Sequence, residues 1–279
     1  MEKKIELIKA GNIKSVRAEA LGINRKNIYH QYGKQQAKDE ALKKDIQKTW
    51  KKKHSSYGAQ RLGWELKVNH KRVTRVMKLF NLKVPRRHHF YTTKASKNHH
   101  TYTNLIKNLK VVKTHQLWCS DVSYIKFQGR FWYLATIEDI FTRQVLGANI
   151  SKYHNSELVM VTIKQAAKKA RQFPKIFHSD QGTEFMAKSC TDYLEQQDTK
   201  ISVSDRASPW QNGYLESFFS RFKDEVGDLN RFETIGEFLE AIYQQIHYYN
   251  YERIQTKLKM PPAVYAKLVT DNCLNKMGS

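Results

Sequence analysis

Three acidic residues stand in contexts suited to one kind of chemistry. Asp121 lies in a β-prone apolar stretch, Asp180 precedes Gln-Gly, and Glu216 follows Asn-Gly-Tyr-Leu, with 35 residues between Asp180 and Glu216. Three carboxylates carried to one place repel each other unless cations hold them. A pair of divalent metal ions is the usual reason for such a cluster, and its usual reaction is in-line displacement at phosphorus.

Each acid alone has an ordinary structural explanation. Asp121 could be a solvent-facing strand residue, Asp180 the N-cap of a following helix, and Glu216 an exposed helix carboxylate. Taken together these explanations weaken, because the expected fold brings the three elements to one place.

The hydrophobic pattern predicts the elements that position the acids. We expect strands at 118–127, 130–139 and 143–150, a helix at 156–171, a strand at 175–179, a helix at 183–197, a strand at 200–204, helices at 212–226 and 233–249, and a final short helix after Pro261-Pro262. This order predicts an α/β ribonuclease-H-like core, a mixed five-stranded sheet flanked by helices.

The N-terminal part predicts all-α helix-turn-helix segments. In residues 1–48 a glycine turn separates two helical patterns, and in residues 49–84 a helix at 57–66 is followed by Asn69 as an N-cap and a helix at 70–79. The candidate DNA contacts in these segments are Arg25, Lys26, Arg61, Lys71, Arg72, Arg75 and Lys78. An ordinary helical hairpin with a solvated basic face is the alternative.

Charge is concentrated at the same end of the chain. Residues 1–110 hold 28 Lys and Arg against 7 Asp and Glu, a net charge of +21, whereas residues 111–279 have a net charge of only +2. Such a field attracts polyanions, with binding that weakens as salt rises. The basic stretch 85–112, with Arg86 and Arg87, is predicted to be a linker. Its histidine pairs lack the partners of a zinc site.

The predicted organisation has five parts: helical segments at 1–48 and 49–84, a linker at 85–112, a catalytic core at 113–228 and a helical extension at 229–279. The three cysteines form neither a disulfide framework nor a zinc site. No apolar run is long enough to span a membrane, and the N-terminus lacks a secretory pattern. A cytoplasmic protein is expected.

Several motifs match one family in order over most of the chain. They cover residues 57–61, 72–77, 118–125, 137–143, 178–182, 208–218 and 248–265. Together they resemble the DDE transposases of bacterial insertion sequences with a retroviral-integrase-like core, nearest to the OrfB or OrfAB transposases of the IS-three family. The 35-residue spacing and Lys223, seven positions after Glu216, also fit this family.

The resemblance implies a magnesium-dependent polynucleotidyl transferase. Asp121, Asp180 and Glu216 would bind two Mg²⁺ ions, for which Mn²⁺ can substitute. One reaction would nick the element's end to free a 3′-OH, and a second would join that 3′-OH to another phosphodiester. Further candidate DNA contacts around these acids are Gln181, Trp210, Asn212 and Lys223.

Supporting roles are expected for residues outside the acids. Asp139 is interpreted as a turn cap rather than a metal ligand. Tyr249, Asn250 and Arg253 are expected to pack against or clamp the helix that carries Glu216.

The resemblance also implies partners. These are DNA, as the element's terminal inverted repeats and its target, and a second copy of the chain, since acting on two DNA ends needs at least a dimer. The chain has no sustained heptad repeat, so an upstream OrfA-type partner or fusion is a further expectation. The protein would act in the bacterial cytoplasm, at the nucleoid. A DNA-binding regulator without chemistry and a structure-selective nuclease remain alternatives.

Overall fold

A computed structural model describes residues 22, 32–53, 56–84, 102–205 and 213–277. None of the helices in these ranges has the length and apolar character needed to cross a membrane. Most of the first predicted helix-turn-helix segment lies outside the described residues, and so do six predicted DNA contacts: Arg25, Lys26, Arg86, Arg87, Trp210 and Asn212.

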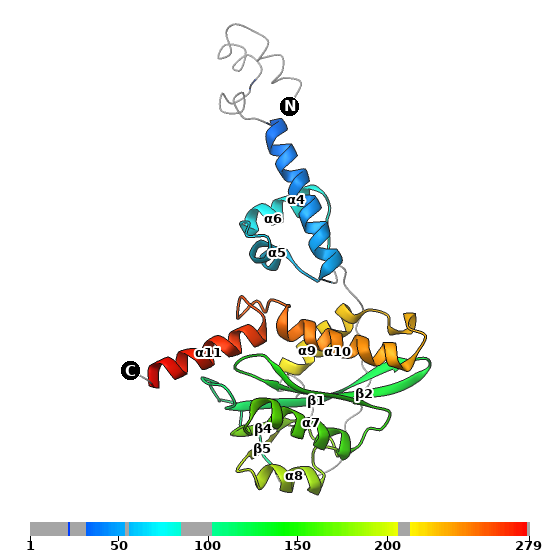
Figure 1. The fold of residues 1–279 in the computed structure, drawn as a ribbon, viewed down its shortest axis with the longest axis vertical. Coiled ribbons are helices and arrows are strands. Elements are labelled where there is room, and N and C mark those ends of the chain that lie inside the picture. Colours follow the sequence, from blue (N-terminus) through cyan, green and yellow to red (C-terminus); the bar gives the residue numbers. More distant parts are fainter. Residues whose placement is uncertain (1–21, 23–31, 54–55, 85–101, 206–212, 278–279) are drawn as a thin grey trace.

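A mixed five-stranded sheet forms the centre of the fold (Figure 1). Strands β1 (Leu117–Phe127), β2 (Arg130–Asp139) and β3 (Val145–Ser151) form an antiparallel meander. Strands β4 (Ile176–Ser179) and β5 (Lys200–Val203) extend the sheet in parallel with β1, which gives the order β3-β2-β1-β4-β5. The predicted ribonuclease-H-like α/β fold is confirmed.

Helices cover both faces of the sheet (Figure 1). One face carries α7 (Ser156–Ala170) and α8 (Lys188–Glu195), and the other carries α9 (Gly213–Val226) and α10 (Ile235–Tyr251). Alternation along β1 divides its side chains between two cores. Cys119 packs with α9 and α10, whereas Trp118 packs with α7 and α8. A 3₁₀ turn, η2 (Leu229–Arg231), joins α9 to α10.

Two predicted helices have different bounds in the structure. The helix expected from residue 183 begins only at Lys188, because the preceding residues form a turn in which the N–H groups of Phe185 and Met186 donate to the Gly182 carbonyl. The final helix, α11 (Pro262–Met277), has 16 residues and is not short as predicted.

Three helices form a unit before the sheet: α4 (Tyr32–Lys52), α5 (Ala59–Glu65) and α6 (His70–Leu79). Their shared core contains Leu42, Ile46, Leu62, Val73 and Val76. Asn69 is the N-cap of α6, as predicted, and its side chain accepts the Lys71 N–H at 2.9 Å. The boundary predicted between residues 48 and 49 falls inside α4, because Ile46 already packs against α5 and α6.

The three-helix unit contacts the chain just after α10. The Tyr57 hydroxyl accepts the Ile254 N–H at 3.0 Å, and Ile254 belongs to the core of this unit. Lys53 Nζ lies 3.2 Å from Glu252 Oε2. The N-terminal unit is therefore fixed to the segment that follows the last sheet-covering helix.

The end of the predicted linker belongs to the core. The Val203 N–H donates to the Thr103 carbonyl, and the Leu105 N–H donates to Ser202 Oγ at 2.9 Å. Ile106 and Leu109 pack against the α9–α10 face. Residues 103–105 thus run along β5, a placement that the weak apolar periodicity of the predicted linker did not predict.

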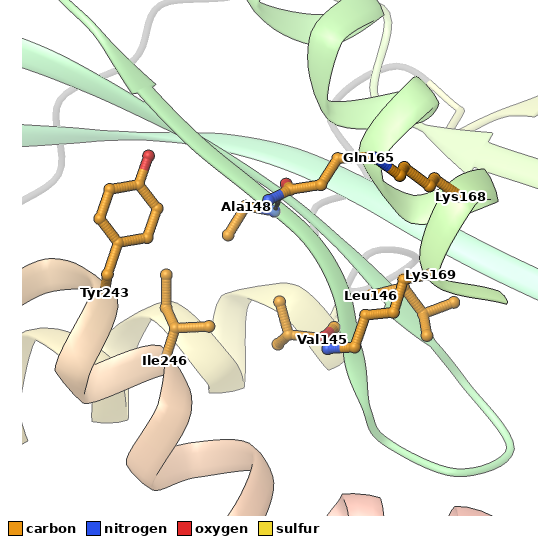
Figure 2. Close-up of a pocket in the computed structure, with 8 residues that line it drawn as sticks. All are labelled: Val145, Leu146, Ala148, Gln165, Lys168, Lys169, Tyr243 and Ile246. Carbon is orange, nitrogen blue, oxygen red and sulfur yellow. Dashed lines mark hydrogen bonds between the residues drawn. The ribbon is translucent and has the colours of Figure 1, made fainter.

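Polar side chains cover the outer edge of β3 (Figure 2). Gln165 accepts the Ala148 N–H at 2.7 Å, Lys169 donates to the Val145 carbonyl at 2.9 Å, and Asn250 bonds both the N–H and the carbonyl of Val145 at 2.9 Å. A cavity of about 450 Å³ lies beside this edge, between α7 and α10. Side chains thus satisfy backbone groups that could pair with another strand.

Asn250 provides a test of this edge. Its side chain is buried, so Asn250→Ala would leave the N–H and carbonyl of Val145 without those bonds. We expect the free energy of unfolding to fall by about 2–4 kcal/mol, measured by urea denaturation. Asn149→Ala is the matched control, since it removes one solvent-exposed bond and should cost under about 0.5 kcal/mol. Equal losses for both variants would contradict the edge-capping role.

Candidate active site

The first two acids lie where β1 and β4 part. Pairing of the two parallel strands ends at Cys119 and His178; Asp121 is two residues further along β1, and Asp180 directly follows β4. The chain runs from β1 to β2 on one side and returns to β4 on the other. Ligands of open α/β sheets bind at such a switch point, outside the carboxyl ends of the parallel strands.

The third acid, Glu216, lies in the first turn of α9. Asp121 shares the strand alternation of Cys119 and Ile125, which face α9 and α10. Its carboxyl therefore points to the side of the sheet that Glu216 approaches. Asp180 and Glu216 are exposed, whereas Asp121 is half-buried.

Electrostatics show that the acids act on one another. The pKa of Asp121 is raised to about 8, first by burial and then by the negative charges of Asp180, Glu216 and Glu184, while the Val122 N–H, which donates to its carboxylate at 2.8 Å, lowers it. Burial also raises the pKa of Glu216. Asp180 and Glu216 thus lie close enough to Asp121 for their charges to act on its carboxyl.

The donor chemistry of the cluster fits a hard divalent cation, which prefers carboxylate oxygens. Within the described part of the chain, no three Asp, Glu, His or Cys side chains lie in an arrangement that could hold a metal ion. The fit therefore rests on ligand type and on the charge that acts on Asp121.

Two alternative roles of the acids can now be assessed. Asp180 is not the N-cap of α8, because that position belongs to Ala187; the Asp180 carboxylate accepts the nearby Gly182 N–H at 3.0 Å. Asp139 is a turn cap, as predicted. Its Oδ1 accepts the Thr142 N–H at 2.8 Å, and its Oδ2 accepts the His115 N–H at 2.6 Å.

A fourth carboxylate beside the cluster was missed from the sequence. Glu184 is buried, and its Oε1 lies 2.8 Å from Nε2 of His154, whose ring stacks on Tyr133 at 4.9 Å. A Cβ at Gly182 would lie 2.6–2.8 Å from the Glu184 carboxylate. The only sequence signal for Glu184 was its position two residues after Gly182. Nothing in the sequence pointed to His154, 30 positions earlier, as its partner.

Two predicted DNA contacts lie close to the acids. Lys223 is exposed on α9, and the charge of Asp121 opposes the lowering of its pKa by burial, so its side chain lies on the Asp121 side of the helix. Gln181 Nε2 donates to the Ser204 carbonyl at 3.0 Å, which fixes this side chain to the end of β5.

The predicted basic contacts of α5 and α6 divide into two groups. Lys71 and Lys78 are exposed on α6. Arg72 donates to the Lys38 carbonyl at 3.2 Å, and Arg75 forms a bidentate pair with Asp39, with Nη1 2.8 Å from Oδ2. These two arginines join α6 to α4, a structural role that the sequence did not indicate.

Arg61 belongs to neither group, because it lies close to Arg221 of α9 and to Arg253, which follows α10. Burial, followed by the charges of Arg253 and Arg221, lowers its pKa to about 10. Its guanidinium also lies over the Tyr57 ring at 5.8 Å.

The expected clamp on α9 is confirmed for two of its three residues. Arg253 Nε donates to Glu225 of α9 at 2.7 Å, and Tyr249 packs edge-to-face on Phe218 of α9 at 4.7 Å. Asn250 instead holds β3, as described above.

Comparison with known proteins identifies the family. Two models described as "Integrase core domain" match residues 112–209 and 197–262. A transposase-like protein of Haemophilus influenzae is 31% identical over 195 residues, which is 70% of this chain and 90% of that protein. The chain belongs to the IS-three family of transposases. A transposase for insertion sequence element IS904 of Lactococcus lactis is 28% identical over 83% of this chain and 95% of its own length.

Membership in the IS-three family assigns the chain to DNA transposition and integration. Among solved structures, the chain is similar to the HTLV-2 integrase catalytic core domain in complex with magnesium. That similarity has 16% identity and a TM-score of 0.45, over 55% of this chain and 96% of the other.

The raised pKa of Asp121 predicts a pH dependence for the metal-free transposase. The folded chain binds this proton more tightly than the unfolded chain, whose pKa is near 3.8. The stabilising contribution is therefore complete below about pH 4 and lost as the pH rises through about 8. At about pH 9 in EDTA, the free energy of unfolding of Asp121→Asn should exceed that of the parent by about 2–4 kcal/mol. This figure starts from ~1.4 kcal/mol for each pKa unit of the shift and is reduced because Asp121 is partly exposed to solvent.

Urea denaturation at about pH 5 and about pH 9 measures this difference. Asp198→Asn, in the exposed turn before β5, is the control and should follow the parent at both pH values. If the stability advantage of Asp121→Asn over the parent does not grow from about pH 5 to about pH 9, the raised pKa is not that of Asp121.

Proposed function

We propose that this chain cuts DNA strands at the ends of an insertion element and joins the freed 3′-OH to target DNA, with Asp121, Asp180 and Glu216 as the catalytic carboxylates. One observation carries the proposal: Asp121 lies at the switch point between β1 and β4, where burial, followed by the charges of Asp180 and Glu216, raises its pKa to about 8. Such clusters mark sites that work with bound cations. Family membership supports the reaction class.

The three carboxylates would hold the divalent ions, two Mg²⁺ that Mn²⁺ can replace. When bound, such ions activate a water or a 3′-OH as the nucleophile and stabilise the leaving oxygen. The acids come from two strand ends and one helix, so that together they can orient the scissile phosphate.

Side chains next to the acids would position the DNA. Lys223 lies on the Asp121 side of α9, where an ammonium can contact a phosphate near the reacting one. The bond from Gln181 to the Ser204 carbonyl holds that side chain beside Asp180.

DNA outside the reacting strand would be held by the basic N-terminal part, with its net charge of +21. Lys71 and Lys78 of α6 are exposed and suited to phosphate contact. Arg25, Lys26, Arg86, Arg87, Trp210 and Asn212 remain proposed contacts from the sequence. Four further expectations remain proposals of the same kind. They are the division into DNA-binding, linker, catalytic and C-terminal parts, action as at least a dimer, an OrfA-type partner and a place at the nucleoid.

A strand-transfer assay tests the proposal. The protein, with Mg²⁺ or Mn²⁺, is given a labelled duplex that carries the element's own end, beside the variants Asp180→Asn and Asp198→Asn. The parent and Asp198→Asn should form joined products, while Asp180→Asn should lose at least ~10³-fold in rate, equivalent to several kcal/mol of transition-state stabilisation.

The other outcomes separate the alternative functions. Salt-sensitive binding of the end with neither cleavage nor joining indicates a DNA-binding regulator. Cleavage without joining indicates a nuclease, and joining by Asp180→Asn at the parental rate removes Asp180 from the site.

A further inference from the structure

A second, basic cavity lies on the side of α9 away from Glu216. It has a volume of about 320 Å³ and lies between the turn after β2, the start of α9 and the segment after α10. Four charged side chains line it: Glu138, Arg143, Arg221 and Lys257. None of the residues that line this cavity takes part in the proposed reaction.

Helical spacing separates the cavity from the acid cluster. Tyr214, Phe218 and Arg221 recur every three or four residues and line the cavity. Glu216 and Lys223, seven residues apart, lie on another face of α9, toward Asp121. One helix therefore presents different chemistry on two sides.

Cations outnumber anions around this cavity. Besides Glu138, which lines the cavity, Glu225 is a buried acid of α9, and Arg253 Nε already occupies both of its oxygens at 2.7 and 2.9 Å. Burial, followed by the charge of Arg253, lowers the pKa of Arg221, and both arginines lower that of Arg61. Like charges are thus held close together without an equal number of acids.

Two buried polar atoms here have no hydrogen-bond partner among the described residues. They are Oε2 of Glu138, which lines the cavity, and Nη1 of Arg253, which does not line it but lies close enough to Arg221 to act on its pKa. Both side chains are about 99% buried. Most buried polar atoms are bonded, so such an atom at a cavity points to a missing ligand.

The remaining contacts leave positive charge available to a ligand. Arg143 lies over the Tyr214 ring at 4.0 Å, with Nη1 3.7 Å from Glu138 Oε1, so Glu138 balances at most this one cation. Arg221 and Lys257 are exposed at the cavity. Burial raises the pKa of Glu138 to about 8, so at neutral pH its carboxyl carries a proton that it can donate.

We propose that this cavity binds a phosphodiester group of DNA, with Arg221 and Lys257 as its cationic ligands, Arg143 fixed beside them by Tyr214, and Glu138 donating to a phosphate oxygen. The inference rests on the proposed function, because it takes DNA as the partner. It adds a phosphate contact on the opposite side of α9 from the reacting one.

The salt dependence of DNA binding tests the cavity. Asp180→Asn protein is titrated into a labelled duplex at several KCl concentrations, alone and combined with Arg221→Gln, Lys257→Gln or the control Lys200→Gln, which changes an exposed lysine at the start of β5. Each cavity variant should weaken binding several-fold and lower the slope of log affinity against log salt by roughly 0.9. Lys200→Gln should match the background protein.

Thermal unfolding of the free proteins separates a binding role from a structural one. Because Arg61 and Arg253 repel Arg221, Arg221→Gln should keep or raise the melting temperature while it weakens DNA binding. A lower melting temperature with an unchanged salt slope would show that Arg221 only supports the fold, and would overturn the proposal.

Two further arms identify the ligand and isolate the proposed reaction. Inorganic phosphate that weakens binding no more than KCl at equal ionic strength supports DNA as the ligand. Phosphate that removes the difference between parent and cavity variants at concentrations well below those of KCl would assign the cavity to the free anion instead. DNA binding is measured here without cleavage. If the parent fails in the strand-transfer assay but the cavity variants still lower the salt slope, only the proposed reaction is rejected and the cavity proposal stands.

Discussion

Repulsion among carboxylates is the constraint around which this fold is arranged. Asp121 is half-buried beside Asp180, Glu216 and Glu184, and burial, followed by the charges of these acids, raises its pKa to about 8. A chain keeps such a cluster only when the surrounding structure outweighs it. Here two apolar cores, one on each face of the sheet, fix the elements that carry the acids. The acids occupy the point where β1 and β4 separate, so no core side chain has to be lost to make room for them.

Holding Glu216 in place depends on how α9 is fixed. Tyr249 packs on Phe218, and the buried Glu225 binds Arg253 and Gln245. A buried ion pair adds little net stability compared with a pair of apolar side chains of similar volume. Removing one partner of the ion pair costs about 3–5 kcal/mol, so the pair favours one position of the helix. Ile254, the next residue, bonds Tyr57 of the N-terminal unit. The unit expected to hold DNA and the helix that carries Glu216 are therefore fixed to the same short segment.

What the sequence predicted well was local. Strands β1 and β2 were placed within a residue of their bounds, because alternation defines each strand and Gly129, at φ +77°, ends the hairpin turn between them. The three acids, whose catalytic role stays a prediction, were selected because their chemistry is recognisable in short motifs. The errors came from contacts distant in sequence: Arg75 finds Asp39 36 residues earlier, and Glu184 finds His154. No pattern in an isolated segment records such a partner.

Boundaries failed for the same reason. Residues 102–112 have weak periodicity, yet the Leu105 N–H bonds Ser202 and Ile106 packs on the core, because β5 offers an edge that only the folded sheet creates. The start of α8 is delayed because the turn after Gly182 is closed by its own backbone bonds. In both places tertiary structure determines the bounds, and local propensity does not.

Helix α9 shows how a period of 3.6 residues combines opposite requirements in one element. Glu216 faces a cluster with surplus negative charge, whereas Arg221, five residues later, lines a cavity with surplus positive charge. The first surplus calls for cations and the second for an anion. A DNA phosphate on the basic side cannot neutralise the acids, and a cation among the acids cannot neutralise the arginines. On the proposed function, DNA and metal ions together would satisfy both sides, so the fully neutralised state of α9 would be the assembled complex rather than the free chain.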